Sequence, residues 1–198
     1  MTRSKYNKTY WDEKYADNKT GWDIGYISTP LQSYFDQIKN KEISILIPGA
    51  GNAYEAEYLF NNGFRNVTII DIAVQPLLNL KHRIPQIEDK FLVQEDFFDH
   101  KGSYDLIIEQ TFFCALDPCL RVAYAKKMKE LLILDGKLVG VLFNRSFNHD
   151  GPPFGGSIVE YENIFIRYFN IRTLSTSYNS ILPRQEQEVF INFEKKNI

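Results

Sequence analysis

The sequence predicts an α/β fold, in which a mostly parallel sheet of seven strands carries helices on both faces and an antiparallel strand at its C-terminal end. Two observations lead to this prediction. Short apolar runs such as 43–47 and 104–108 alternate with segments of helical spacing, which is typical of strands covered by helices on both faces. The last two expected strands, 171–177 and 188–193, have no helix between them, and such a connection joins antiparallel neighbours.

Two short helices, near Lys8–Asp17 and Thr29–Lys39, precede the first strand. In the helix after that strand, Ala56 and Phe60 share one face, and Gly63 ends the helix because glycine readily adopts the left-handed conformation that closes a helix. The elements that follow the two leading helices alternate between strand and helix: 43–47, 52–61, 67–71, 75–81 and 91–94.

In the C-terminal half, Asp117 and Pro118 begin a helix, since an acid is a favoured N-cap and proline fits the first turn. We expect Asp135 and Gly136 to end this helix, which runs to about Leu132, before the fifth strand begins. The elements of this half are a strand, a helix, a strand, a helix and two strands: 104–108, 118–132, 137–143, 157–168, 171–177 and 188–193.

Length and composition indicate one globular domain over residues 1–198. The net charge of −2, without a block of Lys or Arg, argues against a nucleic-acid or anionic membrane partner. No apolar run is long enough to span a membrane, and no apolar segment follows Met1–Lys8 to act as a signal peptide. The two cysteines, Cys114 and Cys119, are too few for a disulfide framework or a zinc site. We therefore expect a cytoplasmic protein that binds no metal and is a monomer.

A glycine turn after the first strand indicates a nucleoside site. Gly49 and Gly51 allow the backbone to turn sharply and to approach a ligand that a Cβ atom would exclude. Asp71 ends the second strand about twenty residues later, where its carboxylate is placed to accept hydrogen bonds from ribose hydroxyls.

The spacing of the turn indicates which nucleoside is bound. A dinucleotide site has the pattern G-x-G-x-x-G, and Tyr54 stands at its last position, so this pattern fails. The spacing Gly49-x-Gly51-x-Ala53 instead resembles the first motif of class I methyltransferases, which bind S-adenosylmethionine (SAM). This segment alone leaves open a purely structural turn.

Polar residues follow the other strands too, at the edge of the sheet where ligands bind in open α/β folds. Asp96 is placed to accept a hydrogen bond from an adenine amino group, and the backbone N–H of Phe97 to meet a ring nitrogen. The alternative for Asp96 is a loop acid or a helix cap. The segments 109–115 and 144–154 follow the fourth and fifth strands.

Longer strings resemble the thiopurine methyltransferase superfamily, and within it most closely the branch of thiol and halide methyltransferases. These strings are Tyr10–Tyr15, Gly21–Gly25, Thr29–Pro30, Gln94–Phe98, Tyr104–Leu116 and Asp150–Phe154. The resemblance covers about Tyr10 to Tyr168. It implies a Rossmann-like class I methyltransferase fold, in which about residues 1–40 form a helical lid over SAM and its substrate.

The resemblance also implies which residues bind the cofactor. Three aromatic residues of the lid would wall the pocket together with residues at the strand ends: Trp11, Tyr15, Trp22, Gly49, Gly51, Asp71, Asp96, Phe97 and Gln110. Relatives can carry tryptophan in place of Tyr15 and tyrosine in place of Gln110. Aromatic faces attract cations, which suits the sulfonium of SAM. The alternative is that the two tryptophans only anchor helices to the core.

We expect the acceptor side of the pocket to be apolar, lined by Phe112, Phe113, Phe147, Pro152, Pro153 and Phe154. Methyl transfer is an in-line displacement that depends mainly on positioning and exclusion of water. A thiol with a pKa near 8.5 needs no strong base, and a halide needs none. Cys114 either borders the pocket or belongs to the core, and His149 either orients the acceptor or caps its loop.

The sequence thus predicts a SAM-dependent methyltransferase that acts on a small soft nucleophile and releases S-adenosylhomocysteine (SAH). The acceptor is a thiol, hydrosulfide or halide, with thiopurines and selenium or tellurium species as further candidates. A noncatalytic regulator that binds SAM or a nucleoside is the alternative of a different class. A nucleotide-dependent oxidoreductase is disfavoured by Tyr54.

Overall fold

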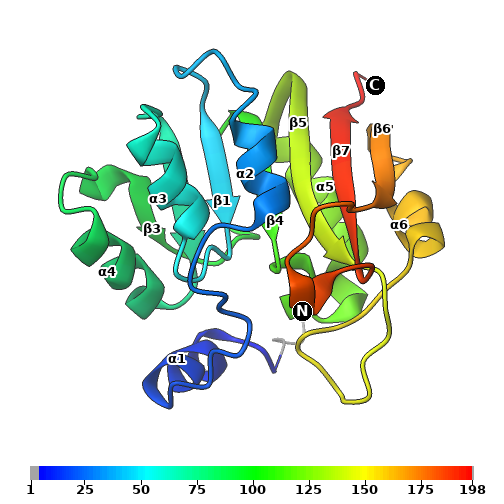
Figure 1. Ribbon diagram of the computed structural model, residues 1–198, viewed down its shortest axis with the longest axis horizontal. Helices are drawn as coiled ribbons and strands as arrows, with labels where there is room; N and C mark the ends of the chain where they lie inside the picture. Colours follow the sequence, from blue (N-terminus) through cyan, green and yellow to red (C-terminus); the bar gives the residue numbers. More distant parts are fainter. Residues whose placement is uncertain (1–4, 198) are drawn as a thin grey trace.

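The computed structural model of the protein describes residues 5–197, and in it seven strands form one sheet in the order β3-β2-β1-β4-β5-β7-β6 (Figure 1). The strands are β1 Ile45–Pro48, β2 Val67–Asp71, β3 Leu92–Gln94, β4 Tyr104–Gln110, β5 Leu132–Phe143, β6 Phe169–Thr176 and β7 Glu188–Lys195. The pairs among β1 to β5 are parallel, whereas β7 runs antiparallel to both of its neighbours, β5 and β6. The predicted fold, with its antiparallel C-terminal strand, is confirmed.

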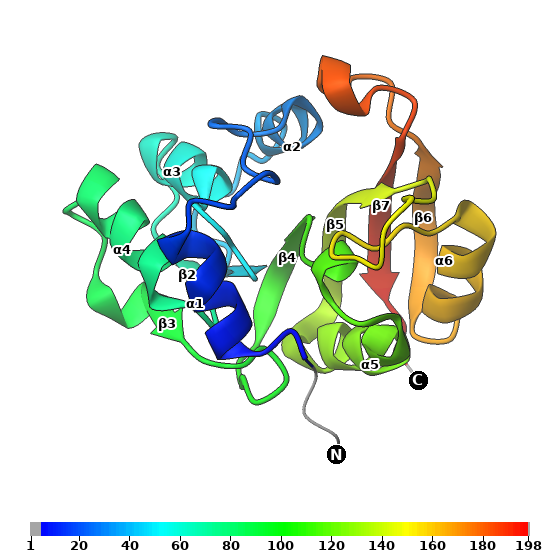
Figure 2. The ribbon, with the colours of Figure 1, turned by 90° about the horizontal axis from the view of Figure 1, so that it is seen from below.

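Helices cover both faces of this sheet, as the view along its lower edge shows (Figure 2). The helices are α1 Lys8–Ala16, α2 Thr29–Phe35, α3 Tyr54–Asn61, α4 Val74–Arg83, α5 Arg121–Leu131 and α6 Ile158–Phe165. On one face α2, α3 and α4 contribute Leu31, Leu59 and Leu80 to a buried core. On the other face α5 and α6 contribute Tyr124 and Phe165 to a second core.

Helix α1, unlike the other helices, does not pack on a face of the sheet. It lies beyond the carboxyl ends of the parallel strands, and none of its residues is fully buried (Figure 1). Its first turn is capped by the Asn7 side chain, which accepts a hydrogen bond from the Tyr10 backbone N–H at 3.2 Å. The expected lid, about 1–40, and the expected domain, 1–198, include residues 1–4 and 198, which lie outside the described residues.

Two predicted boundaries need correction. Helix α2 ends at Phe35, four residues earlier than expected. Asp135 and Gly136 do not end a helix, because α5 stops at Leu131 and β5 begins with the next residue. They form a bulge inside β5, where Asp135 has a φ of 59° and the register against β4 shifts. A Cβ on Gly136 would lie 3.0 Å from two backbone oxygens, so the bulge favours glycine.

Candidate active site

A cavity of about 1360 Å³ opens at the carboxyl ends of the parallel strands, beneath α1. It is lined by the lid, by the ends of β1 to β5 and by the loop between β6 and β7. All residues expected to bind the cofactor line it: Trp11, Tyr15, Trp22, Gly49, Gly51, Asp71, Asp96, Phe97 and Gln110. Pockets for single small ligands usually measure about 300–1,000 Å³, so this cavity has room for a cofactor and a second molecule.

The glycine turn forms one wall of the cavity. Gly49 and Gly51 have φ values of 55° and 52°, in the left-handed region that glycine occupies without strain. A Cβ on Gly49 would lie 2.0 Å from the Phe112 ring, so only glycine lets that ring pack against the turn. Ala53, which stands where the methyltransferase motif has a third glycine, adopts the same conformation with a φ of 54°.

Asp71 joins the end of β2 to this turn. One oxygen of its carboxylate accepts a hydrogen bond from the Gly51 N–H at 3.1 Å, and the other accepts one from the Ala73 N–H at 2.9 Å. Burial raises the pKa of Asp71 to about 6, although these backbone N–H groups act to lower it. Each carboxylate oxygen has two lone pairs, so both retain capacity for a further donor such as a ribose hydroxyl.

The end of β3 supplies Asp96 and Phe97. The Asp96 carboxylate accepts a hydrogen bond from the Phe98 N–H at 2.9 Å, so it caps its own loop while it lines the cavity. The Phe97 side chain is buried, and its ring lies 5.2 Å from that of Phe112 in an edge-to-face arrangement. The Asp96 side chain can therefore cap its loop and also bind a ligand in the cavity, so the two alternatives do not exclude each other.

The lid covers the glycine turn with aromatic rings. Trp22 makes edge-to-face contacts with Trp11 and Tyr15, at centroid distances of 5.5 and 5.7 Å. The lid is also fastened to the start of α3, because the Asp23 carboxylate accepts hydrogen bonds from the Asn52 side chain and from the Tyr54 hydroxyl. The tryptophans therefore face a ligand cavity rather than a closed core.

On the acceptor side, Phe112, Phe147, Pro152 and Pro153 line the cavity. Phe113 needs correction: it is only 1% exposed, and its ring packs at 5.0 Å against the ring of Tyr124. It belongs to the core and not to the lining.

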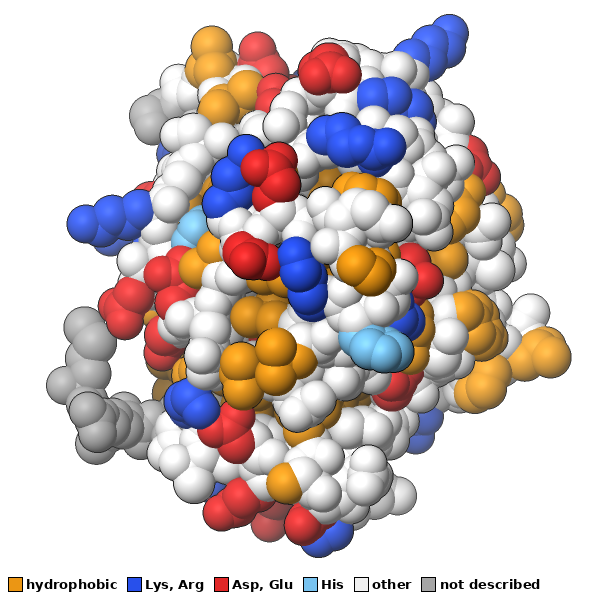
Figure 3. All heavy atoms as spheres, turned by 90° about the vertical axis from the view of Figure 1, so that its left-hand side faces the viewer, with side chains coloured by type: hydrophobic (Ala, Val, Ile, Leu, Met, Phe, Trp, Pro, Cys, Tyr) orange, Lys and Arg blue, Asp and Glu red, His pale blue; other side chains and the backbone are white. Residues whose placement is uncertain are grey.

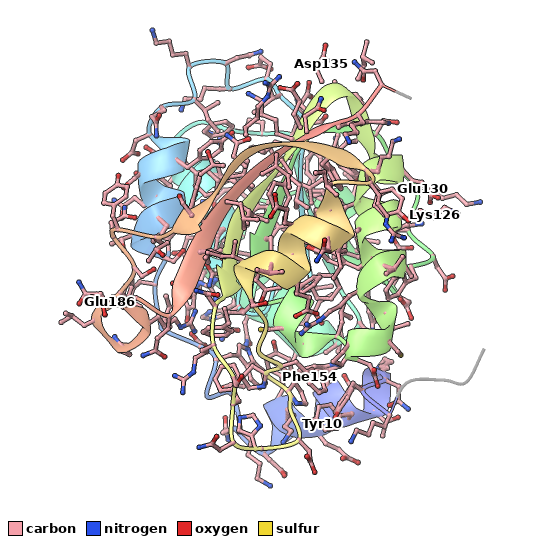
Figure 4. The ribbon with its side chains drawn as sticks, turned by 90° about the vertical axis from the view of Figure 1, so that its right-hand side faces the viewer. Tyr10, Lys126, Glu130, Asp135, Phe154 and Glu186 are labelled. Atoms are coloured by element: carbon pink, nitrogen blue, oxygen red, sulfur yellow. The ribbon has the colours of Figure 1, made fainter. Side chains whose placement is uncertain are left out.

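His149 and Phe154 also lie outside the cavity lining. The exposed His149 ring accepts a hydrogen bond through Nδ1 from the Gly151 N–H at 3.0 Å, so it caps its loop. Phe154 instead contacts the lid, with its ring 5.6 Å from that of Tyr6. Figure 4 shows Phe154 at this junction, next to Tyr10 of α1.

A buried carboxylate and a thiol lie at the wall of the cavity, and the carboxylate holds the loop after β4 in place. Glu109 is fully buried, and its carboxylate accepts hydrogen bonds from the Phe112 and Phe113 N–H groups, at 2.8 and 3.0 Å, and from the Tyr124 hydroxyl. Burial raises the pKa of Glu109 to about 7. Cys114 is 6% exposed and borders the cavity, and burial raises the pKa of its thiol well above the ordinary value.

Sequence reasoning missed two arginines that line the cavity, Arg145 and Arg184. The Arg145 guanidinium lies 4.7 Å from the centroid of the Phe147 ring. Arg184 donates a hydrogen bond to the Trp22 backbone oxygen at 2.9 Å, which ties it to the lid. A signal for Arg184 was available: β6 runs in the direction of β1 to β5, so the loop after it reaches the same edge of the sheet.

Two kinds of feature are absent from the described residues: clusters of metal ligands and helices that could span a membrane. Within residues 5–197, no group of three or more His, Cys, Asp or Glu side chains is arranged to hold a metal ion. In the same range, no helix has the length and apolar character needed to cross a bilayer.

Sequence comparison shows which family the chain resembles. The model of the family "Thiopurine S-methyltransferase (TPMT)" matches residues 6–197. A probable thiol methyltransferase 2 of Arabidopsis thaliana is 26% identical over 193 residues, covering 94% of this chain and 85% of that protein. Thiocyanate methyltransferase 1 of Brassica oleracea is 28% identical over 194 residues, with the same coverage of 94% and 85%. Thiopurine S-methyltransferase of Vibrio campbellii is 26% identical and covers 93% of this chain and 97% of its own length.

Solved structures share the fold. The 1,6-didemethyltoxoflavin-N1-methyltransferase of Burkholderia thailandensis, with bound SAH, superimposes with a TM-score of 0.74 at 16% identity, covering 96% of this chain and 87% of its own. A TehB-like SAM-dependent methyltransferase of Corynebacterium glutamicum gives a TM-score of 0.68 at 16% identity, with coverages of 96% and 98%. Both support a class I methyltransferase fold for this chain.

Proposed function

The chain belongs to the thiopurine S-methyltransferase family, and from that premise we propose that it methylates a small, soft nucleophile: a thiol, hydrosulfide or a halide. It is a SAM-dependent methyltransferase, so the alternative of a noncatalytic binding protein is set aside. The observation that carries the proposal is a single cavity, in which the glycine turn adjoins an apolar pocket that contains arginine side chains.

The residues of the cavity fit SAM. The left-handed turn at Gly49 and Gly51 brings the backbone to the cavity surface, and the buried Asp71 carboxylate retains acceptor capacity beside it. When bound, SAM supplies an electrophilic methyl group on a sulfonium cation. We assign Asp71 to the ribose hydroxyls, and Asp96 with the Phe97 backbone to the adenine.

The lid residues Trp11, Tyr15 and Trp22 act on the same ligand from the other side. Their ring faces attract a cation at distances of up to about 6 Å, by about 0.5–2 kcal/mol each depending on desolvation. They also exclude water from the cofactor. The hydroxyl of Tyr15 and the indole nitrogen of Trp22 each lie 3.7 Å from the position of a Cβ on Gly51, which supports a close fit over the turn.

The acceptor pocket combines apolar walls with positive charge. Phe112, Phe147 and Pro153 desolvate a bound nucleophile, while the guanidinium of Arg145 attracts an anion. A nearby cation favours the thiolate form of a thiol, and a halide or thiocyanate ion is already anionic. Large, polarizable anions lose little hydration energy on entering such a pocket. The names of the relatives, which include thiol and thiocyanate methyltransferases, agree with this class of acceptor.

The surface and the cysteines support a small-molecule substrate and a reducing compartment. On the face that carries α4 and β3, Lys and Arg side chains are mixed with Asp and Glu (Figure 3). Such a mixture is unlike the basic surfaces that bind nucleic acids. Both cysteines are free thiols, and we propose a cytoplasmic monomer.

A panel of acceptors tests the proposed function. The protein is incubated with SAM and, separately, with hydrosulfide, a small thiol, thiocyanate, iodide or 6-mercaptopurine, and the released SAH is measured. We expect turnover with the small soft nucleophiles at neutral pH. Turnover with 6-mercaptopurine alone, or with no acceptor of the panel, would contradict the proposal.

A further inference from the structure

Glu55, in the first turn of α3, presents a buried carboxylate to the cavity. It is 5% exposed and lines the same space as the glycine turn. The backbone N–H groups of Glu55 and Ser28 face this carboxylate and act to lower its pKa, as does the Arg184 guanidinium at longer range. Arg184 forms its ion pair with Glu188 instead, at 3.4 Å. A carboxylate this deeply buried is rare unless a cation pairs with it.

The partners of Glu55 leave acceptor capacity unused. A carboxylate offers about four lone-pair sites, and two backbone donors fill only some of them. Burial raises the pKa of Glu55 to about 7, with the backbone donors and Arg184 acting in the opposite direction. A cationic ligand group in the cavity would compensate the cost of keeping this charge buried.

The order of the strands indicates which part of SAM meets Glu55. The strand ends that line the cavity follow the sheet order β3, β2, β1 and β4, and carry Asp96, Asp71, Gly49 and Gln110 in turn. With the adenine assigned to β3 and the ribose to β2, the amino-acid end of SAM extends toward β4.

Glu55 belongs to that β4 side of the cavity. Ser28 connects the two, because its backbone N–H faces Glu55 and its hydroxyl donates a hydrogen bond to the Gln110 side chain at 2.7 Å. Arg184, which acts on Glu55 electrostatically, lines the same cavity. A carboxylate and a guanidinium at one end of a cavity match the ammonium and the carboxylate of a free amino acid.

We propose that Glu55 binds the α-ammonium group of the methionine portion of SAM. This inference rests on the proposed function. An N–H donor and an acceptor that are both charged form a short and strong hydrogen bond, and Asp71 is assigned to the other end of the cofactor. Glu55 is thus a cofactor-binding residue that the pattern of strand ends does not reveal, because it follows the turn and lies within a helix.

Calorimetry with two ligands tests this directly. The ligands are SAH and an analogue of SAH in which hydrogen replaces the α-ammonium group. We expect the wild-type protein to bind SAH about tenfold or more tightly than the analogue. This comparison needs no substitution, so equal affinities for the two ligands would overturn the inference whatever any variant does.

The variant Glu55→Gln assigns the preference to this residue. The amide keeps an acceptor for the Ser28 N–H but has no charge, so the preference for SAH over the analogue should fall to about twofold or less. Binding of 5′-methylthioadenosine, which lacks the amino-acid portion, should not change. Glu57→Gln, the same substitution outside the cavity lining on the same helix, should keep the full preference.

Three other outcomes count against the inference. Equal weakening of all three ligands in Glu55→Gln would show that Glu55 only anchors the lid. Unchanged SAH affinity with lost turnover would make it a proton acceptor for the methyl acceptor. Failure of the wild-type protein to bind any of the three ligands would overturn the proposed function itself. This result differs from a failure of the Glu55 inference alone, in which the wild-type protein still binds the ligands.

Discussion

Replacing Asp71 by asparagine removes the charge that we expect the ribose hydroxyls to meet, while it keeps the shape of the side chain. A hydrogen bond to a charged group contributes about 1.5–3 kcal/mol, so loss of the charge should weaken nucleoside binding by about tenfold or more. The ligand for this measurement is 5′-methylthioadenosine, because it has no ammonium group and is therefore insensitive to Glu55. Calorimetry at several pH values gives the affinity.

The pH dependence of this binding follows from the burial of Asp71. Its pKa in the folded protein is about 6, above the ordinary value of 3.8, so the unliganded protein loses stability as the pH rises from about 4 to about 6, where the carboxylate becomes ionised. A ligand that donates hydrogen bonds to the carboxylate favours the ionised form and offsets that loss. The affinity should therefore be constant above about pH 7 and fall below pH 6, approaching tenfold per pH unit. In Asp71→Asn the pH dependence should disappear.

An affinity for 5′-methylthioadenosine that is the same at pH 5 and pH 7, and the same in the variant, would refute this assignment of the ribose. Loss of stability in the variant is a separate effect. Asparagine can accept a hydrogen bond from only one of the Gly51 and Ala73 N–H groups, because its amide nitrogen is a donor. A thermal melt of the variant without ligand measures that effect by itself.

Three further changes probe other parts of the site. Gly49→Ala should lower the free energy of unfolding by about 1–3 kcal/mol and weaken SAH binding, because the new Cβ would overlap the Phe112 ring. The control for backbone strain in the same denaturation assay is Gly63→Ala, since Gly63 also has a positive φ but a Cβ there would meet no atom within 4 Å. Arg145→Met should lower kcat/KM for hydrosulfide or iodide by about tenfold and leave the SAH affinity unchanged, as steady-state release of SAH will show. Because burial raises the pKa of the Cys114 thiol, a thiol reagent at pH 7 should modify only the exposed cysteine, and mass spectrometry of a digest identifies the modified peptide.

The sequence predicts most of the site because so much of it lies where parallel strands end. Gly49, Asp71 and Gln110 each stand at or directly after a strand whose apolar run is easy to recognise. The sheet brings those ends to one edge whatever the intervening loops do. For these residues, the place in the sequence therefore also predicts the place in the folded protein.

The acceptor side is harder to predict because it consists of loops without a repeating pattern. Phe112 and Phe113 are neighbours of the same type, yet the first lines the cavity and the second is core. Their placement depends on Glu109, whose carboxylate holds both backbone N–H groups from a buried position. No property of the two phenylalanines alone distinguishes them.

Prediction from the sequence is equally difficult for residues whose role depends on contacts with distant segments of the chain. Glu55 occupies a helix that the sequence predicts, and Glu57, which is only half-buried, has the same side chain on the same helix. What separates them is their surroundings. Glu55 faces the Ser28 backbone, which comes from a segment far away in the sequence, whereas Glu57 forms an ion pair with Arg83. The bulge at Asp135 and Gly136 is similar: the dipeptide signals a change of direction, but only pairing with β4 makes it a bulge and not a helix end.

The first part of the lid, residues 5–25 with α1, is bonded to three separate parts of the fold, and this has consequences for binding. Asp23 is bonded to the start of α3, Arg184 to the Trp22 backbone, and the Tyr6 hydroxyl to the Asp150 backbone oxygen at 3.2 Å. Each such bond contributes only about 0.5–3 kcal/mol, and α1 has no fully buried residue to add to them. Opening the lid therefore costs much less than unfolding the sheet. Because two of the three contacts are made by loops that also line or border the acceptor pocket, closing the lid over the cofactor also completes the walls around the acceptor.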